Sequence, residues 1–106
     1  MVREITAAEL AARRSAGEEP LVLDVREGWE LEIARLPFVR HIPMNEIPAR
    51  LSELDPQVEV IVLCRSGGRS MQVAQFLERR GFRSAVNLSG GILAWSREVD
   101  PSIPGY

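Results

Sequence analysis

The segment Leu63-Cys64-Arg65-Ser66-Gly67-Gly68-Arg69-Ser70 lies between an apolar run, residues 58–63, and a stretch with helical spacing of apolar residues, 70–80. The apolar run predicts a buried strand and the second stretch predicts a helix. Cys64 is the only cysteine in the chain, and the four residues between it and Arg69 include two glycines. A nucleophile that ends a strand, followed by a glycine turn and a helix start, is typical of an anion-binding catalytic loop.

Expected strands and helices alternate along the rest of the chain. Thr6 and Glu9 form a capping-box pattern, whereas residues 28–33 fit a short strand and a helical turn equally well. The expected strands are 3–5, 21–23, 41–42, 58–63 and 85–88, and the expected helices are 7–16, 46–54 (capped by Asn45), 70–80 and 92–99. This order predicts an α/β fold with a mostly parallel sheet of four to five short strands and helices on both faces. We expect one domain, residues 1–106.

Three polar or glycine-rich turns follow three of these strands. They are Asp24-Val25-Arg26, the loop 64–69, and Ser89-Gly90-Gly91. The carboxyl ends of parallel strands lie at one edge of a sheet, and ligands of open α/β sheets bind at that edge. We therefore expect the three turns to meet around Cys64.

Composition excludes several classes of function. One cysteine and one histidine exclude an internal disulfide and a cysteine- or histidine-rich metal site, and we expect no metal or cofactor. All thirteen basic residues are arginine, which excludes a Schiff-base lysine. A net charge of −2 does not favour a nucleic-acid partner. No apolar run reaches the roughly 20 residues of a membrane span, and the first residues lack a signal-peptide core, so we expect a cytoplasmic location.

The loop contains what is needed to stabilise a thiolate. A free cysteine has a pKa of about 8.5, and lowering it below 7 takes roughly 2 kcal/mol of preferential stabilisation of the anion. Backbone amides of the turn, the positive end of the following helix, and the nearby Arg65 and Arg69 are three sources of it. We expect Gly67 and Gly68 to adopt positive φ, which points the amides inward.

The motif Cys-Arg-Ser-Gly-Gly-Arg-Ser resembles the active-site loop of the single-domain rhodanese (thiosulfate sulfurtransferase) family. The similarity continues over nearly the whole chain, in order. It includes residues 21–27 (Leu-Val-Leu-Asp-Val-Arg-Glu), Trp29-Glu30, His41-Ile42-Pro43, and residues 87–95 (Asn-Leu-Ser-Gly-Gly-Ile-Leu-Ala-Trp). The resemblance implies the three-layer rhodanese-like fold.

The resemblance also implies a mechanism and roles for the loop residues. The Cys64 thiolate takes the outer sulfur of a donor such as thiosulfate, forms a persulfide, and passes the sulfur to cyanide or a thiol. The backbone amides of the loop, Arg65, Ser66, Gly67, Gly68 and Arg69, hold the persulfide. Arg65 binds the anionic donor, and Arg69 either does the same or holds the loop through a carboxylate such as Glu30.

The remaining candidates are supporting residues. We expect Asp24 and Arg26 to form an ion pair or to hydrogen-bond the adjoining loop, and His41 to be structural. Ser66 and Ser70 are expected to satisfy the loop backbone and to cap the helix. The two tryptophans, Trp29 and Trp95, are expected in the core or in the wall of the pocket.

Two other functions remain open. A cysteine phosphatase or arsenate reductase also holds an anion ahead of a helix, but phosphatases use a Cys-x5-Arg loop that is one residue longer than Cys64-x4-Arg69. Alternatively, the domain relays persulfide sulfur for a protein partner in cofactor or tRNA sulfuration, or serves as a regulatory module of the same fold. An intact loop argues against an inert module, but it does not separate a free-standing enzyme from a relay.

Overall fold

A single five-stranded sheet organises the computed structural model, which describes all of residues 1–106. The strands are β1 (Arg3–Ile5), β2 (Leu21–Asp24), β3 (Arg40–His41), β4 (Val60–Leu63) and β5 (Ala85–Leu88), in the order β1-β5-β4-β2-β3. Every neighbouring pair is parallel. The predicted α/β fold with a parallel sheet is thus confirmed. The sheet has five strands, the larger of the two numbers expected.

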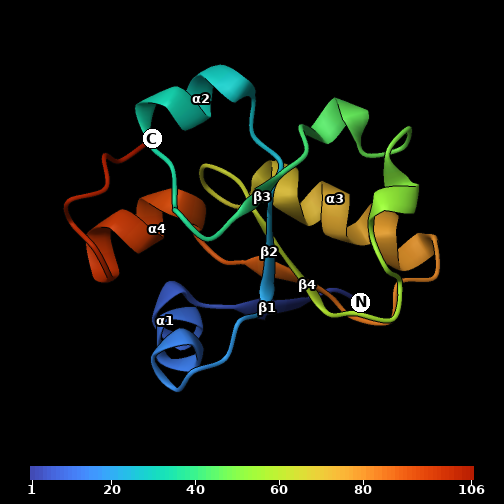
Figure 1. Ribbon diagram of the computed structural model, residues 1–106, viewed down its shortest axis with the longest axis horizontal. Coiled ribbons are helices and arrows are strands. Elements are labelled where there is room, and N and C mark those ends of the chain that lie inside the picture. The colour runs from blue at the N-terminus through green and yellow to red at the C-terminus, as the bar shows by residue number, and fades with distance from the viewer.

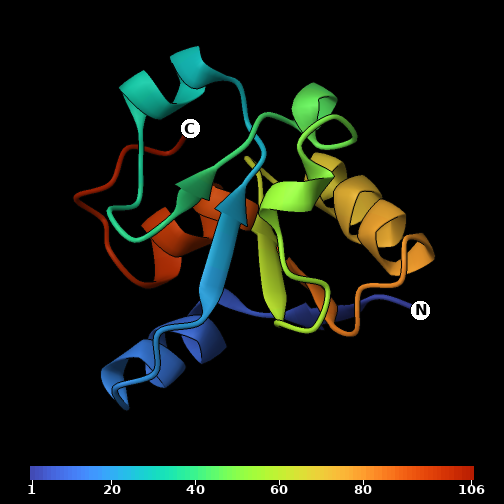
Figure 2. The same ribbon diagram turned by 45° about the vertical axis from the view of Figure 1, so that its right-hand side comes forward.

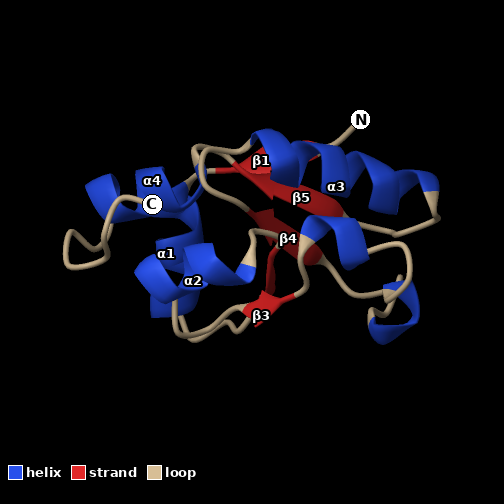
Figure 3. Cartoon of the chain, turned by 90° about the horizontal axis from the view of Figure 1, so that it is seen from above, coloured by secondary structure: helices blue, strands red, loops and turns tan.

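Helices cover both faces of this sheet. They are α1 (Ala7–Ser15), α2 (Gly28–Ile33), α3 (Gly68–Arg79) and α4 (Gly91–Glu98). α3 covers one face, and α1 and α4 pack together on the other (Figure 3). Thr6 and Glu9 cap α1 reciprocally, as predicted. None of the helices has both the length and the apolar character that crossing a bilayer requires.

The central strand β4 divides the core into two layers because its side chains alternate between the faces. Ile61 and Leu63 pack in the cluster with α1 and α4. Val60, Val62 and Cys64 pack in the cluster with α3. The alternation therefore directs the cysteine toward the helix that follows it.

Residues 44–54 differ from the prediction. The expected helix from Glu46 to Leu54 is replaced by two short 3₁₀ helices, Met44–Glu46 and Leu51–Glu53. The break comes at Arg50, whose φ −111° and ψ 15° leave helical geometry, and not at Pro48, which lies in the first turn, where an N–H has no intrahelical partner. The prediction was wrong because three-to-four spacing of apolar residues does not register such a backbone break.

The carboxyl ends of the strands meet, as expected. The Val25 N–H donates to the carbonyl of Leu63, which joins the turn after β2 to the end of β4. The first turn of α4 binds the cysteine loop, because Ile92 and Leu93 donate to the carbonyls of Cys64 and Arg65. β2 points toward α2 and the C-terminus, which lie side by side at this end of the molecule (Figures 1 and 2).

The close approach of α4 to the cysteine loop predicts that Gly91→Ala destabilises the protein. Gly91 has φ +58°, and an added Cβ would overlap the backbone of Cys64 and Arg65. We expect the free energy of unfolding, measured by denaturant titration, to fall by about 2 kcal/mol or more. Gly28→Ala is the matched control, since Gly28 is also the first residue of a helix, its φ is not positive, and an added Cβ meets nothing within 4 Å. Equal stability of the two variants would contradict this account of the loop.

Candidate active site

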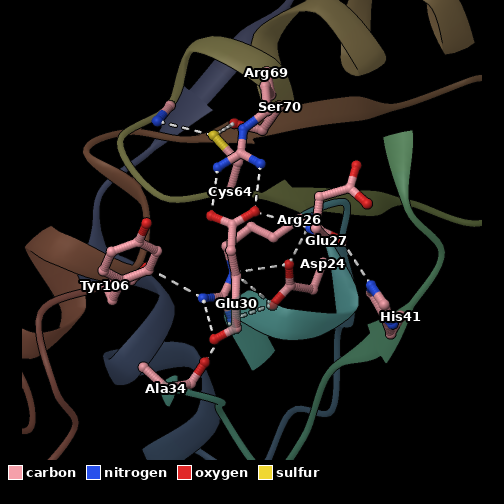
Figure 4. Close-up of polar contacts among 11 residues, drawn as sticks. Asp24, Arg26, Glu27, Glu30, Ala34, His41, Cys64, Arg69, Ser70 and Tyr106 are labelled. Carbon is pink, nitrogen blue, oxygen red and sulfur yellow. Dashed lines mark hydrogen bonds and ion pairs between the residues drawn. The ribbon is translucent and has the colours of Figure 1, made fainter. Parts of the chain in front are cut away.

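The sulfur of Cys64 lies at the base of a loop between β4 and α3. Gly67 turns the chain with φ 111°, and α3 begins at the next residue with its amino end toward the sulfur. The Gly67 N–H donates to Cys64 Sγ (3.1 Å; Figure 4). The backbone amides of Ser66 and Ser70 also favour the anionic form of the sulfur and lower the pKa of the thiol. Cys64 is only 1% exposed, so the sulfur is reached through the mouth of this loop.

Two expectations about the loop were wrong in detail. Gly67 has a positive φ, but Gly68 does not, and an added Cβ on Gly68 would meet no atom within 4 Å. α3 begins two residues earlier than predicted, at Gly68, so Ser70 lies inside the helix and does not cap it. Gly67 alone supplies the left-handed turn. The Gly68 and Arg69 amides have no backbone acceptor, as is normal in the first turn of a helix.

The Ser70 hydroxyl has two neighbours that compete for one proton. It lies 3.2 Å from Cys64 Sγ and also within hydrogen-bond distance of Asn87 Oδ1. Because a hydroxyl carries a single hydrogen, Ser70 donates to one of them at a time. Asn87 is held in place by its amide N–H groups, which donate to Glu4 Oε2 (2.9 Å) and to the Gly67 carbonyl (3.2 Å). Asn87 therefore supports both Ser70 and the turn at Gly67.

Hydrogen bonds outweigh burial in setting the acidity of Cys64. Burial by itself raises the pKa of the Cys64 thiol, since it disfavours the anion. Donors from the Ser70 hydroxyl and from the amides of Ser70, Gly67 and Ser66 act in the opposite direction, and the pKa is lowered overall. The loop thus favours the thiolate although no histidine hydrogen-bonds the sulfur.

Arg69 holds the loop to α2 through Glu30. Its guanidinium forms a two-pronged ion pair with the carboxylate, with N–O distances of 2.6 and 2.8 Å. Glu30 is 3% exposed, and the hydrogen bond from Arg69 is the main reason that its pKa is lowered. Of the two roles that we considered for Arg69, the structure has the loop-holding ion pair.

Asp24 and Arg26 form a buried ion pair behind the loop, as expected. Both side chains are 0% exposed, and Arg26 Nη2 lies 2.7 Å from Asp24 Oδ2. The rest of the guanidinium donates to backbone carbonyls of Glu30, Ala34 and Tyr106 (Figure 4). Arg26 thereby fastens α2 and the C-terminal segment beside the cysteine loop.

Arg65 is the unpaired cation of the site. Its side chain is exposed and makes no ion pair or hydrogen bond, in contrast to Arg26 and Arg69. The guanidinium carbon lies 4.7 Å from the centre of the Tyr106 ring. The position that we expected to bind an anionic donor is therefore free to do so.

The other singled-out residues have structural surroundings, with one exception. The His41 Nε2–H donates to the Arg26 carbonyl (2.7 Å), which ties up that nitrogen. Trp95 is buried in the core. Trp29 is not a core residue, since it is 53% exposed and meets Tyr106 edge to face, with ring centres 5.4 Å apart.

Chemically, the arrangement combines groups that favour an anionic sulfur with groups that attract an anion. The surface hollow between the 3₁₀ helix Met44–Glu46 and α3, about 330 Å³, contains none of the loop residues. No three metal-binding side chains gather anywhere in the structure. What the site offers is a nucleophilic sulfur, amide donors around it, and a free guanidinium at the mouth.

Sequence reasoning missed two residues of this site. Asn87 carries the only polar side chain in the buried strand β5, and that anomaly was a usable signal. Tyr106 ends an extended tail with no local pattern to mark it, and only its contacts with Arg26, Trp29 and Arg65 reveal its place.

Comparison with known proteins is consistent with this geometry. The model of the rhodanese-like domain family matches residues 6–98. The chain is 47% identical over 93 residues to Rhodanese-like/PpiC domain-containing protein 12 of Arabidopsis thaliana, covering 84% of this chain and 31% of that protein. It is 40% identical to a putative sulfurtransferase of Bacillus subtilis, covering 94% of this chain and 96% of the relative.

A solved structure extends the agreement to three dimensions. The crystal structure of a rhodanese-like domain protein from Staphylococcus aureus superposes with a TM-score of 0.86 at 30% sequence identity, covering 97% of each chain. The match over residues 6–98 includes every helix, four of the five strands, and the whole cysteine loop. On this basis the chain belongs to the rhodanese-like domain family.

Proposed function

We propose that this protein is a sulfurtransferase that carries sulfur as a persulfide on Cys64. The Cys64 thiolate attacks the outer sulfur of thiosulfate, a new S–S bond forms, and the S–S bond of the donor breaks to release sulfite with its electron pair. An acceptor such as cyanide or a thiol then attacks the outer sulfur and regenerates the Cys64 thiolate. Thiosulfate brings two negative charges, and sulfite leaves with two.

The observation that carries this proposal is the set of donors around one buried sulfur. Amides of Ser66, Gly67 and Ser70 and the Ser70 hydroxyl lower the pKa of the Cys64 thiol, although burial alone raises it. Covalent catalysis uses the thiolate, and these donors shift the Cys64 thiol toward that anion without a base. Thiolate attack on sulfur requires no proton transfer to the donor, so the missing base is no handicap.

The loop also has capacity for a second sulfur atom. The amides of Gly68 and Arg69 donate to no backbone acceptor. We assign them, together with the Gly67 N–H, to the outer sulfur of the persulfide, whose negative charge also favours the amino end of α3. This is the role that the resemblance implied for the backbone of the loop.

Phosphate ester hydrolysis is the less suitable alternative. Its loop would have to cradle a tetrahedral oxyanion with one residue fewer than phosphatases use, and an acid would have to protonate the leaving group. Two carboxylates beside the loop are engaged, Asp24 with Arg26 and Glu30 with Arg69. Sulfur transfer requires neither a cradle for a tetrahedral oxyanion nor an acid that protonates the leaving group.

The acceptor defines whether the protein works alone or as a relay. Cys64 is 1% exposed, which favours a small acceptor such as cyanide or a thiol, and a protein acceptor would first meet exposed side chains such as Arg65 and Trp29. Rapid transfer to or from a partner beside poor cyanide turnover would identify the relay.

The first test is intact-protein mass spectrometry after incubation with thiosulfate. We expect the mass to rise by one sulfur atom, about 32 Da, and to return to its starting value on addition of cyanide. Cys64→Ser should show no gain while keeping the thermal unfolding midpoint of the wild type. Sulfur bound to the serine variant, or none bound to the wild type, would refute the proposal.

The second test concerns the Ser70 hydroxyl. Ser70→Ala removes a donor to the thiolate, so the pKa of Cys64 should rise, and alkylation by iodoacetamide at neutral pH should slow roughly tenfold. The measurement is the pH profile of the alkylation rate, whose midpoint moves to higher pH. Ser66→Ala is the control, because Ser66 acts on the sulfur through its backbone amide. Identical profiles for the two variants would remove the Ser70 hydroxyl from this role.

The third test concerns the free guanidinium. Arg65→Ala should raise the KM for thiosulfate roughly tenfold, since a hydrogen bond to a charged group contributes about 1.5–3 kcal/mol. Stability should not change, because the Arg65 side chain is exposed and unpaired. Arg83→Ala matches the change in charge, since Arg83 is exposed and precedes β5, at the opposite edge of the sheet. An unchanged KM in Arg65→Ala would assign donor binding elsewhere.

A further inference from the structure

The three arginines near Cys64 differ in what restrains them. Arg26 and Arg69 are fixed by carboxylates, at 2.7 Å and 2.6 Å respectively. Arg65 has no polar partner, and a long unrestrained side chain loses rotamer entropy when it binds an anion. A contact that limits its freedom beforehand would lower the cost of binding.

The only aromatic contact of Arg65 comes from the far end of the chain. The Arg65 guanidinium lies over the Tyr106 ring, 4.7 Å from its centre, which is within cation–π range. The two residues are separated by the whole of α3, β5 and α4 in the sequence. Their contact therefore depends on the return of residues 101–106 to the carboxyl edge of the sheet.

Tyr106 is itself held at three points. Its carbonyl accepts from Arg26 Nη1 (3.2 Å), and its ring meets Trp29 edge to face at 5.4 Å (Figure 4 shows the first of these contacts). Upstream, the Ile103 carbonyl accepts from the Ser96 hydroxyl, and Ile103 packs on the core. The position of the Tyr106 ring is thus set by its contacts with Arg26 and Trp29 and by the packing of Ile103. The Arg65 guanidinium, which has no ion-pair partner, lies over this ring.

We propose that Tyr106 is a positioning residue for donor binding, which holds the Arg65 guanidinium at the mouth of the cysteine loop. Trp29 supports the ring through its edge-to-face contact. The proposal rests on the proposed function, because it assumes that Arg65 meets the anionic donor. It makes the C-terminal segment a part of the active site.

A purely structural role for Tyr106 makes a different prediction, and a double-mutant cycle separates the two. The variants are Tyr106→Leu, which keeps apolar bulk without a ring, Arg65→Ala, and the two combined. The measured quantity is the thiosulfate concentration that gives half the maximal rate of persulfide formation, followed by intact mass. We expect Tyr106→Leu to raise this thiosulfate concentration roughly two- to fivefold when Arg65 is present. When Arg65 is already replaced by alanine, Tyr106→Leu should cause no further increase.

Three further variants sharpen the result. Tyr106→Phe keeps the ring and should behave as the wild type. Trp29→Ala should give a smaller rise in the same direction. Phe76→Leu removes a ring from another arginine contact, with Arg80 at 5.7 Å on α3, and should change nothing. All variants are checked for the wild-type unfolding midpoint.

Two outcomes would overturn the proposal. They are no change in Tyr106→Leu and Trp29→Ala, or the same increase from Tyr106→Leu with and without Arg65. Both are distinct from failure of the proposed function, in which saturating thiosulfate adds no sulfur to the wild type. Under our proposal Tyr106→Leu still gains one sulfur at saturation, and only the concentration that it needs is altered.

Discussion

The buried ion pair between Asp24 and Arg26 is the interaction on which the surroundings of the active site depend. Both side chains are fully buried, and an isolated charge there would cost several kcal/mol. The pair is tolerated because the guanidinium also donates to the carbonyls of Glu30, Ala34 and Tyr106. One strand end thereby anchors α2 and the C-terminal segment, neither of which belongs to the sheet. Removal of the Arg26 side chain would break the hydrogen bonds to both segments.

The three arginines near Cys64 therefore have different roles. Arg26 organises the backbone, and Arg69 ties the cysteine loop to α2 through the carboxylate of Glu30. Glu30 is positioned both by the Glu27 amide, which donates to its carboxylate, and by Arg26, which donates to its carbonyl. Arg65 is left without a carboxylate, and it is the one guanidinium whose charge is available to a ligand. Arginine suits all three roles, since its planar fork satisfies several acceptors and also stacks on an aromatic ring.

The sequence predicted the sheet and the meeting of its strand ends because the signals are local. Short apolar runs that end in polar or glycine turns mark 21–24, 60–64 and 85–90 regardless of the rest of the chain. The helix expected at 46–54 did not form because the backbone leaves helical geometry at Arg50, which the spacing of apolar residues does not register. Of the two places expected for Trp29, the core is excluded, because a large apolar residue on a six-residue helix need not face it. Asn87 and Tyr106 act through partners 17 and 80 residues away, which no local pattern reveals.

The hydrogen bonds on Cys64 have to serve both halves of the proposed cycle. In the first half the sulfur attacks, and in the second it leaves as a thiolate when the acceptor takes the outer sulfur. A lowered pKa makes the thiolate abundant and a better leaving group, but it also reduces intrinsic nucleophilicity. Burial raises the pKa of the Cys64 thiol and the donors lower it by more, so the net effect favours the thiolate. The single Ser70 proton suits that balance, because it can turn to the sulfur when charge is present and to Asn87 when it is not.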